Sequence, residues 1–463
     1  MLFRVLDDAR PLRAAFLGWA FGVGKYGVGA SWIYVSIHDY GPSPVWLAGS
    51  LVAVFVFAMA WFPALFTFAY ARWIRGPNRW VNAIGFCACW VALEWALTWV
   101  LTGFPWLYLG YAHIDDPLRH FAPVGGVLLV SFVAALSASF AVAAIARDAS
   151  RRMLTIGVVA ALVPWFVGYA LGYVRWVEPG SEGRVALVQG DIPQDVKWRP
   201  ESVAPILDRY RTLTEPYWNH DLVIWPEAAV TLFEQEAQPF IEEMARRAND
   251  TGAALVFGVP GFEREADGDV TFRNMAVVVG HGSGHYVKRR LVPFGEYVPL
   301  ESLLRGAIEF FDLPMSHAGA GPMQQPLLQA GRWRLATAIC YEVVYPDLVR
   351  RDARDADVIV TISNDAWFGH SIGPHQHMQM VRMRALENGR YVLRATNNGI
   401  TAIVSPEGVV VAQAPQFEPT VLEGPFSGMK GVTPYGSLGD VPVLLLIVAS
   451  LVVALAVRRR VAR

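Results

Sequence analysis

The chain has 463 residues, of which 54% are hydrophobic and 17% are charged, and its formal net charge is −1 at pH 7. Soluble globular proteins carry about 25% charged residues, and here only 20 of the 79 charged residues lie within the first 178 positions. This distribution excludes a single soluble domain, a disordered chain and a polybasic nucleic-acid-binding protein. It predicts a membrane region followed by a water-exposed region.

Six apolar stretches approach or exceed the 20 or so residues that are needed to cross a bilayer. They lie at residues 12–33, 45–70, 80–101, 121–146, 153–174 and 441–457. Lys25 and several glycines interrupt the first stretch, and Glu94 lies within the third. A charge inside a span is often functional. The alternative is a structural charge that a partner satisfies, or, for Lys25, a misplaced end of the span.

Arginines alternate across these spans and predict their orientation. Clusters of three or four arginines precede the first span and follow the second, fourth and last spans, whereas the intervening loops hold three aspartates and one arginine. Because cytoplasmic loops are enriched in Lys and Arg, we expect the water-exposed region to lie outside the cytoplasm. The predicted domains are a transmembrane domain of about five spans at 1–178, an outer domain at 179–438, and a final span with a basic tail at 439–463.

The outer domain contains short runs rich in Val and Ile that stop at polar residues, a pattern typical of buried strands. Helical patterns lie between several of them, at about 200–218, 236–250, 345–354 and 373–390. Strands that alternate with helices predict an α/β domain with covered sheets. The chemistry of such domains gathers at the carboxyl ends of the strands. Here these ends carry Glu227, Cys340, Tyr341, Glu342, Asn364 and Asp365.

Three of the polar residues in this domain supply the parts of a thiol acyl-transfer site. Cys340 is the one cysteine outside the apolar half, and Lys288, one of four lysines in the chain, directly follows a predicted strand. Glu227 can take the thiol proton, and a lysine cation can stabilise both the thiolate and a developing oxyanion. The alternative is an inert core cysteine, a glutamate that caps a loop and a solvated lysine. No cysteine or histidine spacing indicates a metal or redox site.

The order of these three residues resembles the Glu–Lys–Cys triad of the nitrilase superfamily, and longer motifs narrow the resemblance. The outer domain reads V-Q-G-D-I-P-Q-D-V-K-W at 188–198, W-P-E at 225–227, K-R-R-L-V-P-F-G-E-Y-V-P at 288–299, A-I-C-Y-E at 338–342, T-I-S-N-D-A-W-F-G at 361–369 and T-N-N-G at 396–399. The membrane region reads W-I-Y-V-S-I at 32–37 and L-T-G-F-P-W-L at 101–107. Together these motifs resemble the apolipoprotein N-acyltransferase family.

The resemblance implies a multi-span α-helical membrane domain joined to an α/β nitrilase-like domain with an αββα sandwich. It implies that Cys340 is the nucleophile and holds an acyl thioester, that Glu227 is the general base, and that Lys288 stabilises the tetrahedral intermediate. It implies no metal and no cofactor. It also implies four supporting residues: Glu296, Glu342, Tyr341 and Trp198. Glu296 is expected to orient Lys288 or to share proton transfer. For the aromatic residues Tyr341 and Trp198, the alternative is ordinary packing.

The resemblance further implies the substrates and the location. The acyl donor is expected to be a membrane phospholipid, phosphatidylethanolamine at its sn-1 position, and the acceptor the α-amino group of a diacylglyceryl-cysteine on an apolipoprotein. The enzyme is expected in the bacterial inner membrane with its catalytic domain on the periplasmic side. Members of the family typically have eight spans, so the first two are expected to be missing here. Apolar residues at 300–321 predict a lid or membrane-dipping arm, with a packed helix and loop as the alternative.

Two other functions stay open from the sequence. A membrane-tethered nitrilase-type amidase would need the same triad, with water in place of the lipoprotein amine. This alternative does not explain why the chain has several membrane spans. A non-catalytic receptor or transport component would be supported by the charges at Lys25 and Glu94, and an intact triad argues against it.

Overall fold

The computed structural model describes residues 1–41, 43–145, 150–264, 270–297 and 318–461. By their internal contacts the residues form two compact units. The first unit comprises Met1–Tyr34, Pro44–Trp176 and Thr433–Arg463, and the second comprises Val35–Ser43 and Val177–Val432. The short segment Val35–Ser43 therefore belongs by its contacts to the second unit, although it lies between two predicted spans in the sequence.

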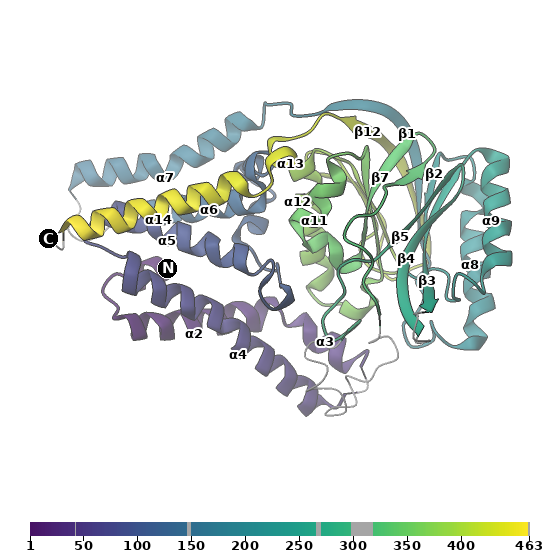
Figure 1. The fold of residues 1–463 in the computed structure, drawn as a ribbon, viewed down its shortest axis with the longest axis horizontal. Coiled ribbons are helices and arrows are strands. Elements are labelled where there is room, and N and C mark those ends of the chain that lie inside the picture. Colours follow the sequence, from purple (N-terminus) through teal and green to yellow (C-terminus); the bar gives the residue numbers. More distant parts are fainter. Residues whose placement is uncertain (42, 146–149, 265–269, 298–317, 462–463) are drawn as a thin grey trace. The chain divides into compact units, whose positions relative to one another are not determined.

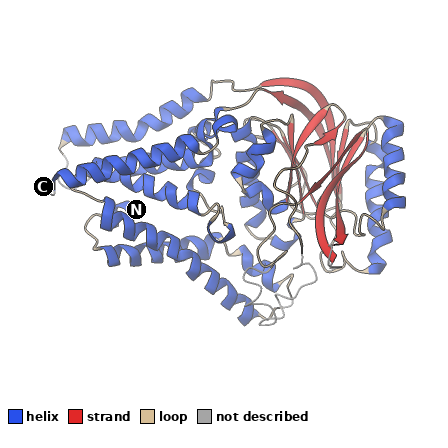
Figure 2. Ribbon diagram, viewed as in Figure 1, coloured by secondary structure: helices blue, strands red, loops and turns tan. Residues whose placement is uncertain are grey.

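The first unit is helical (Figure 1 and Figure 2). Each of the six predicted spans corresponds to a helix in it. The helices of this unit are α1 (Leu2–Val5), α2 (Pro11–Gly29), α4 (Val45–Ala69), α5 (Arg79–Ala96), α6 (Ala122–Ala144), α7 (Arg151–Leu171), α13 (Pro434–Leu438) and α14 (Val441–Val461), and α3 (Trp32–His38) crosses from this unit into the second.

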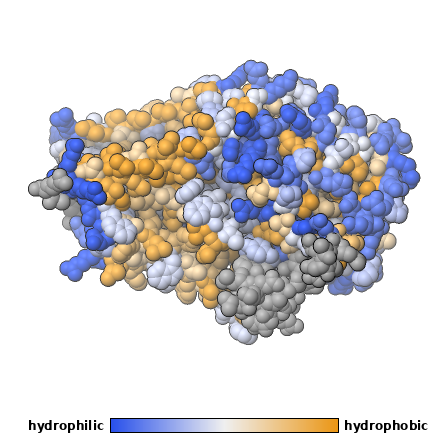
Figure 3. Space-filling model, viewed as in Figure 1, coloured by the Kyte–Doolittle hydropathy of each residue, from blue (hydrophilic) through white to orange (hydrophobic). Residues whose placement is uncertain are grey.

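Four helical stretches among the described residues are long and apolar enough to cross a membrane. They are Val45–Ile74, Pro117–Ala144, Arg151–Leu171 and Val441–Arg460. The helices α2 and α5 form where spans were predicted, but charged and polar residues lower the hydropathy of both. On the face that Figure 3 shows, apolar side chains predominate over the helices of this unit, as expected for helices that face lipid.

Among its described residues, the second unit is built on a sheet of twelve strands. Their order is β11-β10-β9-β8-β7-β6-β5-β4-β3-β2-β1-β12, and β1–β2–β3 and β7–β8–β9 are parallel. The strands are β1 (Glu178–Gln189), β2 (Leu222–Ile224), β3 (Ala254–Arg264), β4 (Val270–Gly280), β5 (Gly282–Val287), β6 (Leu328–Ala330), β7 (Trp333–Ile339), β8 (Val358–Ser363), β9 (Val392–Thr396), β10 (Ala402–Val404), β11 (Val410–Gln413) and β12 (Thr420–Lys430).

The two halves of this sheet pack face to face and are covered by helices outside. Buried aliphatic residues of β1 and β2 share one core with those of β7 and β8, and each fully buried aliphatic side chain contributes about 1.5–3 kcal/mol. Helices α8 (Val203–Thr214) and α9 (Gln238–Thr251) cover one outer face, and α11 (Pro346–Ala353) and α12 (Gly373–Asn388) cover the other (Figure 1). The predicted αββα sandwich is thus confirmed.

This topology brings several strand ends to one edge. The segments after β2, β7, β8 and β9 emerge from the carboxyl ends of the parallel strands. Strand β5 runs in the same direction as β3, because β4 pairs antiparallel with both. The residue that follows β5 therefore reaches the edge at which the other segments begin.

Candidate active site

Cys340 directly follows β7 and begins a short 3-10 turn, Cys340–Val344. Its φ is +52°, in the left-handed region that residues with a side chain rarely occupy. Such a conformation costs about 1–3 kcal/mol and persists when the surrounding structure fixes it. It raises the thiol on a sharp turn at the end of a buried strand, as in other strand-to-helix nucleophile turns.

The Glu342 carboxylate fixes this turn. One of its oxygens accepts hydrogen bonds from the Tyr286 hydroxyl and from the backbone N–H of Ile339, each at 2.8 Å. Its other oxygen accepts from the backbone N–H groups of Arg289 at 2.6 Å and of Arg290 at 3.1 Å. Burial raises the pKa of Glu342, and these donors oppose that shift. Glu342 therefore ties the turn after β7 to the segment that follows β5.

Glu227 lies in the turn that follows β2, and its side chain is 9% exposed. Its Oε1 lies 2.7 Å from Nδ2 of Asn274 and 3.2 Å from Nζ of Lys288. Its Oε2 accepts a hydrogen bond from the backbone N–H of Asn364 at 2.8 Å. Burial raises the pKa of Glu227, but the Lys288 ammonium and these donors outweigh burial and hold the pKa below its ordinary value. Glu227 is therefore an ionised carboxylate that can accept a proton.

Lys288 directly follows β5 and is 1% exposed. Its Nζ lies 2.8 Å from Oε1 of Glu296, whose Oε2 accepts a hydrogen bond from the backbone N–H of Val292 at 2.8 Å. Burial lowers the pKa of Lys288, but the carboxylates of Glu227 and Glu296 outweigh burial and raise it. Lys288 is thus a fixed cation between two carboxylates.

The Cys340 thiol lies close enough to these charges for them to act on it. Burial raises its pKa, the negative charge of Glu227 raises it further, and the cation of Lys288 opposes both. The net shift is upward, so the resting group is a neutral thiol. A neutral thiol attacks a carbonyl only when a base removes its proton as the bond forms, and the ionised carboxylate of Glu227 is a group that can do so.

Asparagines connect the segments that carry the sequence motifs. Asn364, which follows β8, donates through Nδ2 to Oε1 of Gln194 at 2.8 Å. Asn397, which follows β9, donates to Oδ1 of Asn364 at 3.1 Å and accepts through its carbonyl from the backbone N–H of Asp191 at 2.8 Å. Hydrogen bonds thus connect the motifs at 188–198, 361–369 and 396–399 to one another, and Asn364 connects them to the Glu227 carboxylate.

A second buried ionic group lies behind the same strands. Oδ2 of Asp365 lies 2.6 Å from Nη2 of Arg394, and its Oδ1 lies 2.6 Å from Oγ of Ser363 and 3.3 Å from Nδ1 of His377. Although burial raises the pKa of Asp365, Arg394 and His377 hold it well below its ordinary value. Its charge also acts on the Cys340 thiol, whose pKa it raises.

The structure brings most of the predicted site residues together. Glu227, Lys288 and Glu296 form one hydrogen-bonded cluster at the edge where Cys340 begins its turn, and Glu342 supports that turn. Tyr341 is 8% exposed and packs edge-on against Tyr345, with ring centroids 5.4 Å apart. Trp198 is 38% exposed, and its ring lies 6.0 Å from Nζ of Lys197. Most of the predicted lid at 300–321 lies outside the described residues.

Two residues of the site were not predicted as functional. Asn274 lies within β4, directly before a run of apolar residues, and no local pattern marks it. Lys197 is 1% exposed and donates through Nζ to the backbone carbonyl of Glu227 at 3.3 Å. The rarity of lysine, which singled out Lys288, is the signal that could have identified Lys197.

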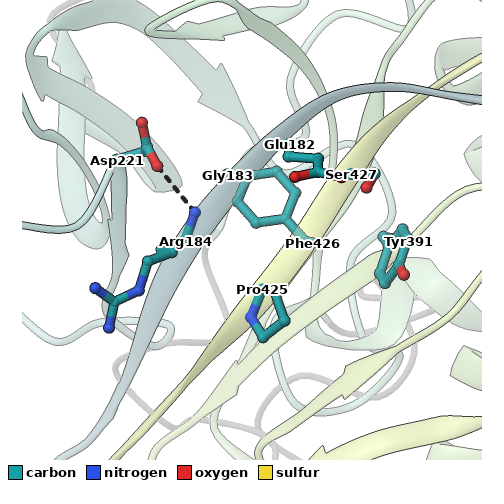
Figure 4. A pocket seen from close by; sticks show the side chains of 8 residues that line it. All are labelled: Glu182, Gly183, Arg184, Asp221, Tyr391, Pro425, Phe426 and Ser427. Atoms are coloured by element: carbon teal, nitrogen blue, oxygen red, sulfur yellow. Dashed lines mark hydrogen bonds between the residues drawn. The ribbon is translucent and has the colours of Figure 1, made fainter.

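A cavity of about 370 Å³ lies elsewhere in the second unit. It opens beside the amino-terminal part of β1 and the end of β12, where the backbone N–H of Arg184 donates to Oδ2 of Asp221 at 2.9 Å (Figure 4). None of the catalytic candidates lines it. It lies at the amino ends of β1 and β2, away from the edge that carries Glu227.

Comparison with known families agrees with both units. The family model described as carbon-nitrogen hydrolase matches residues 184–427, and the one described as apolipoprotein N-acyltransferase N-terminal domain matches residues 1–140. A solved CN-hydrolase superfamily protein from Xanthomonas campestris overlaps with 54% of this chain and 91% of its own, with 22% identity and a TM-score of 0.41.

Curated relatives match nearly the whole chain. A protein from Azotobacter vinelandii named apolipoprotein N-acyltransferase is 47% identical over 439 residues, which cover 94% of this chain and 85% of the relative. One of the same name from Pseudomonas aeruginosa strain PAO1 is 48% identical over 424 residues, covering 91% and 83% of the two chains. A third, from Methylococcus capsulatus, is 40% identical over 463 residues, covering 99% and 91%.

Proposed function

The chain belongs to the apolipoprotein N-acyltransferase family, and we propose that Cys340, Glu227 and Lys288 perform its acyl transfer. The protein is an acyltransferase of lipoprotein maturation. One observation carries the assignment of the residues: Lys288 joins the carboxylates of Glu227 and Glu296 at the strand edge where Cys340 begins its turn. A nucleophile, a base and a cation are the groups that acyl transfer through a thioester requires.

In the first step the sulfur of Cys340 attacks the ester carbonyl of a phospholipid while Glu227 takes the thiol proton. Lys288 stabilises the negative charge that develops on the carbonyl oxygen. The tetrahedral intermediate then collapses, the bond between the carbonyl carbon and the ester oxygen breaks, and Glu227 returns its proton to the departing lysophospholipid. The acyl chain remains on Cys340 as a thioester.

In the second step the α-amino group of the diacylglyceryl-cysteine attacks the thioester. Glu227 takes a proton from the nitrogen, an amide forms, and the sulfur leaves and is protonated again by Glu227. Water has to be kept from the thioester, because hydrolysis would release the fatty acid and waste the donor. Phosphatidylethanolamine is the donor that we propose.

The proposal is tested by intact mass measurement of the purified protein after incubation with phosphatidylethanolamine. We expect an adduct with the mass of one acyl chain, which hydroxylamine removes because a thioester is labile to it. Subsequent addition of a diacylglyceryl lipopeptide should remove the adduct and give a tri-acylated product. Release of free fatty acid in place of that product would favour an amidase-like hydrolase.

Two variants assign the adduct to one sulfur. Cys340→Ala should form no adduct, whereas Cys89→Ala, which alters a cysteine of α5 in the first unit, should form it at the rate of the unaltered protein. An adduct on Cys340→Ala would contradict the mechanism.

We further propose that the protein lies in the inner membrane with its second unit on the periplasmic side. Arginine clusters such as Arg458–Arg460 at the end of α14 support this orientation. In a Cys340→Ala background, Glu201→Cys, at an exposed position, should react with a membrane-impermeant maleimide in spheroplasts, and Arg459→Cys, also at an exposed position, should not. The reverse labelling pattern would invert the orientation.

A further inference from the structure

Two of the four lysines of the chain are buried against the same glutamate. Lys288 reaches the carboxylate of Glu227, with 3.2 Å between Nζ and Oε1. Lys197 reaches the backbone of the same residue, with 3.3 Å between its Nζ and the carbonyl oxygen of Glu227. Each lysine is 1% exposed. Burying an ammonium group is costly unless polar partners satisfy it, so the position of Lys197 requires an explanation.

The carbonyl that Lys197 contacts belongs to a strained turn. Ala228, which follows Glu227, has a φ of +47°. The turn also packs closely against Gly258 of β3. A Cβ atom added to Gly258 would lie only 2.5 Å from the backbone nitrogen of Ala228, so a side chain there would clash with the turn. The same glycine donates through its N–H to the carbonyl of Pro226 at 3.2 Å. The peptide after Glu227 thus packs against β3 on one side and accepts a hydrogen bond from Lys197.

We propose that Lys197 is a positioning residue for the general base, because its ammonium holds the strained peptide between Glu227 and Ala228 and so keeps the Glu227 carboxylate directed toward Lys288. The inference rests on the proposed role of Glu227. It assigns a function to the lysine of the motif at 188–198, which the mechanism itself does not use.

The charge of Lys197 has a second effect. It lowers the pKa of Glu227, in addition to the larger effects of Lys288 and the hydrogen bonds. Burial in turn lowers the pKa of Lys197 to about 8, and the charge of Glu227 opposes that shift. Among the described residues Glu227 is the charged group that acts on Lys197, and the ring of Trp198 lies 6.0 Å from its Nζ. Lys197 is therefore a cation at neutral pH that loses its charge above pH 8.

The experiment measures the rate of thioester formation against pH in single-turnover reactions with phosphatidylethanolamine vesicles. Lys197→Met removes the charge and the hydrogen bond, Lys197→Gln keeps an N–H donor without the charge, and Lys197→Arg keeps a charge that does not titrate. Lys430→Met, at an exposed lysine of β12, is the matched control. Thermal unfolding of each variant reports on folding.

Lys197→Met should form the thioester about 10- to 100-fold more slowly, the loss expected when a reacting group is misplaced by about 1 Å. Its loss of activity at acid pH should begin at a higher pH than in the unaltered protein, because Glu227 loses a stabilising charge. Lys197→Gln should share that acid shift with a smaller loss of rate. Lys197→Arg should restore both the rate and the position of the acid limb. The unaltered protein should lose rate above about pH 8, where Lys197 loses its charge, and Lys197→Arg should not. Lys430→Met should change nothing.

A folded Lys197→Met with an unchanged rate and acid limb would overturn the inference. If Lys197→Met does not fold, an unchanged acid limb in Lys197→Gln would overturn it. Glu227→Gln separates this inference from the proposed function: thioester formation at the full rate in Glu227→Gln would remove Glu227 from the mechanism whatever the Lys197 variants do.

Discussion

The side-chain amide of Asn274 donates a hydrogen bond to the Glu227 carboxylate across 2.7 Å, from the middle of β4, which β3 separates from β2. A hydrogen bond to a charged group contributes about 1.5–3 kcal/mol. It favours the ionised form of Glu227 and so lowers its pKa. In the mechanism that we propose, Glu227 has to be ionised to accept the thiol proton, so Asn274 is expected to extend the pH range of thioester formation toward acid.

Replacement of Asn274 should therefore shift the acid limb of activity. We expect Asn274→Leu to raise the pKa of Glu227, because the carboxylate loses a hydrogen bond that favours its ionised form. The rate of thioester formation should then decline at a higher pH as the solution is acidified. The pH dependence of adduct formation measures this, with Asn249→Ala on the exposed face of α9 as the control. An unchanged acid limb in Asn274→Leu would contradict the role of Glu227 as base.

The ends of the strands were the part of the site that the sequence could predict. Glu227 and Cys340 each follow a short apolar run, and Lys288 follows another, so local pattern and chemistry located all three. Asn274 could not be found in this way, because it lies inside a strand and reaches Glu227 only through the pairing of β4 in the sheet. Lys197 is 30 residues from Glu227 in the chain, and only the fold brings them together.

The fold was predictable to the same extent. The six apolar stretches predicted six helices, and alternating strands and helices predicted a covered α/β domain. The segment Val35–Ser43 shows what was missed. Oγ of Ser36 donates to the carbonyl of Trp367 at 2.8 Å, and Tyr40 packs edge-on against the ring of Trp367. These contacts, which join positions more than 300 residues apart, have no signal in local hydropathy.

Removal of Lys288 should greatly reduce activity. Lys288→Met leaves the carboxylates of Glu227 and Glu296 buried without the cation between them, and the pKa of Glu227 is expected to rise because the ammonium that opposes the effect of burial is gone. In the proposed mechanism the tetrahedral intermediate also loses its stabilising charge, a loss typically of 10²–10³-fold in rate. Single-turnover adduct formation measures this. Lys288→Arg should recover little, because a planar guanidinium cannot replace a compact ammonium between two carboxylates. Near-normal rates in Lys288→Arg would argue against this geometry.

The Asp365–Arg394 pair should stabilise the second unit in a pH-dependent way. The pKa of Asp365 is depressed in the folded protein, so its contribution is fully present above the ordinary aspartate pKa of about 3.9 and is lost as the pH falls below it. Asp365→Asn leaves Arg394 buried without its counter-charge, which typically costs about 3–5 kcal/mol. Denaturant unfolding in detergent should show a large difference at pH 7 that shrinks below pH 4. The exposed pair Asp195–Arg199 supplies the control, since Asp195→Asn should change stability little.

The last prediction concerns Glu94, the charge inside the third predicted span. Glu94 is fully buried in α5, and its Oε1 accepts hydrogen bonds from Nε1 of Trp90 at 2.9 Å and from the backbone N–H of Leu109 at 2.8 Å. The Lys25 ammonium is buried 5.2 Å from the centroid of the Trp90 ring. These contacts favour the structural interpretation of the charge over a functional one.

Glu94→Leu should therefore destabilise the first unit and leave the chemistry intact. It removes the acceptor of two buried donors, and each unsatisfied donor costs about 1–3 kcal/mol. Glu94→Gln keeps an acceptor oxygen and should be less damaging. We expect a lower unfolding temperature for Glu94→Leu than for Glu94→Gln, with normal thioester formation at temperatures where both are folded. If instead both variants fold normally and lose activity, the charge serves the reaction. A structural role predicts the reverse, which is lower stability with normal activity.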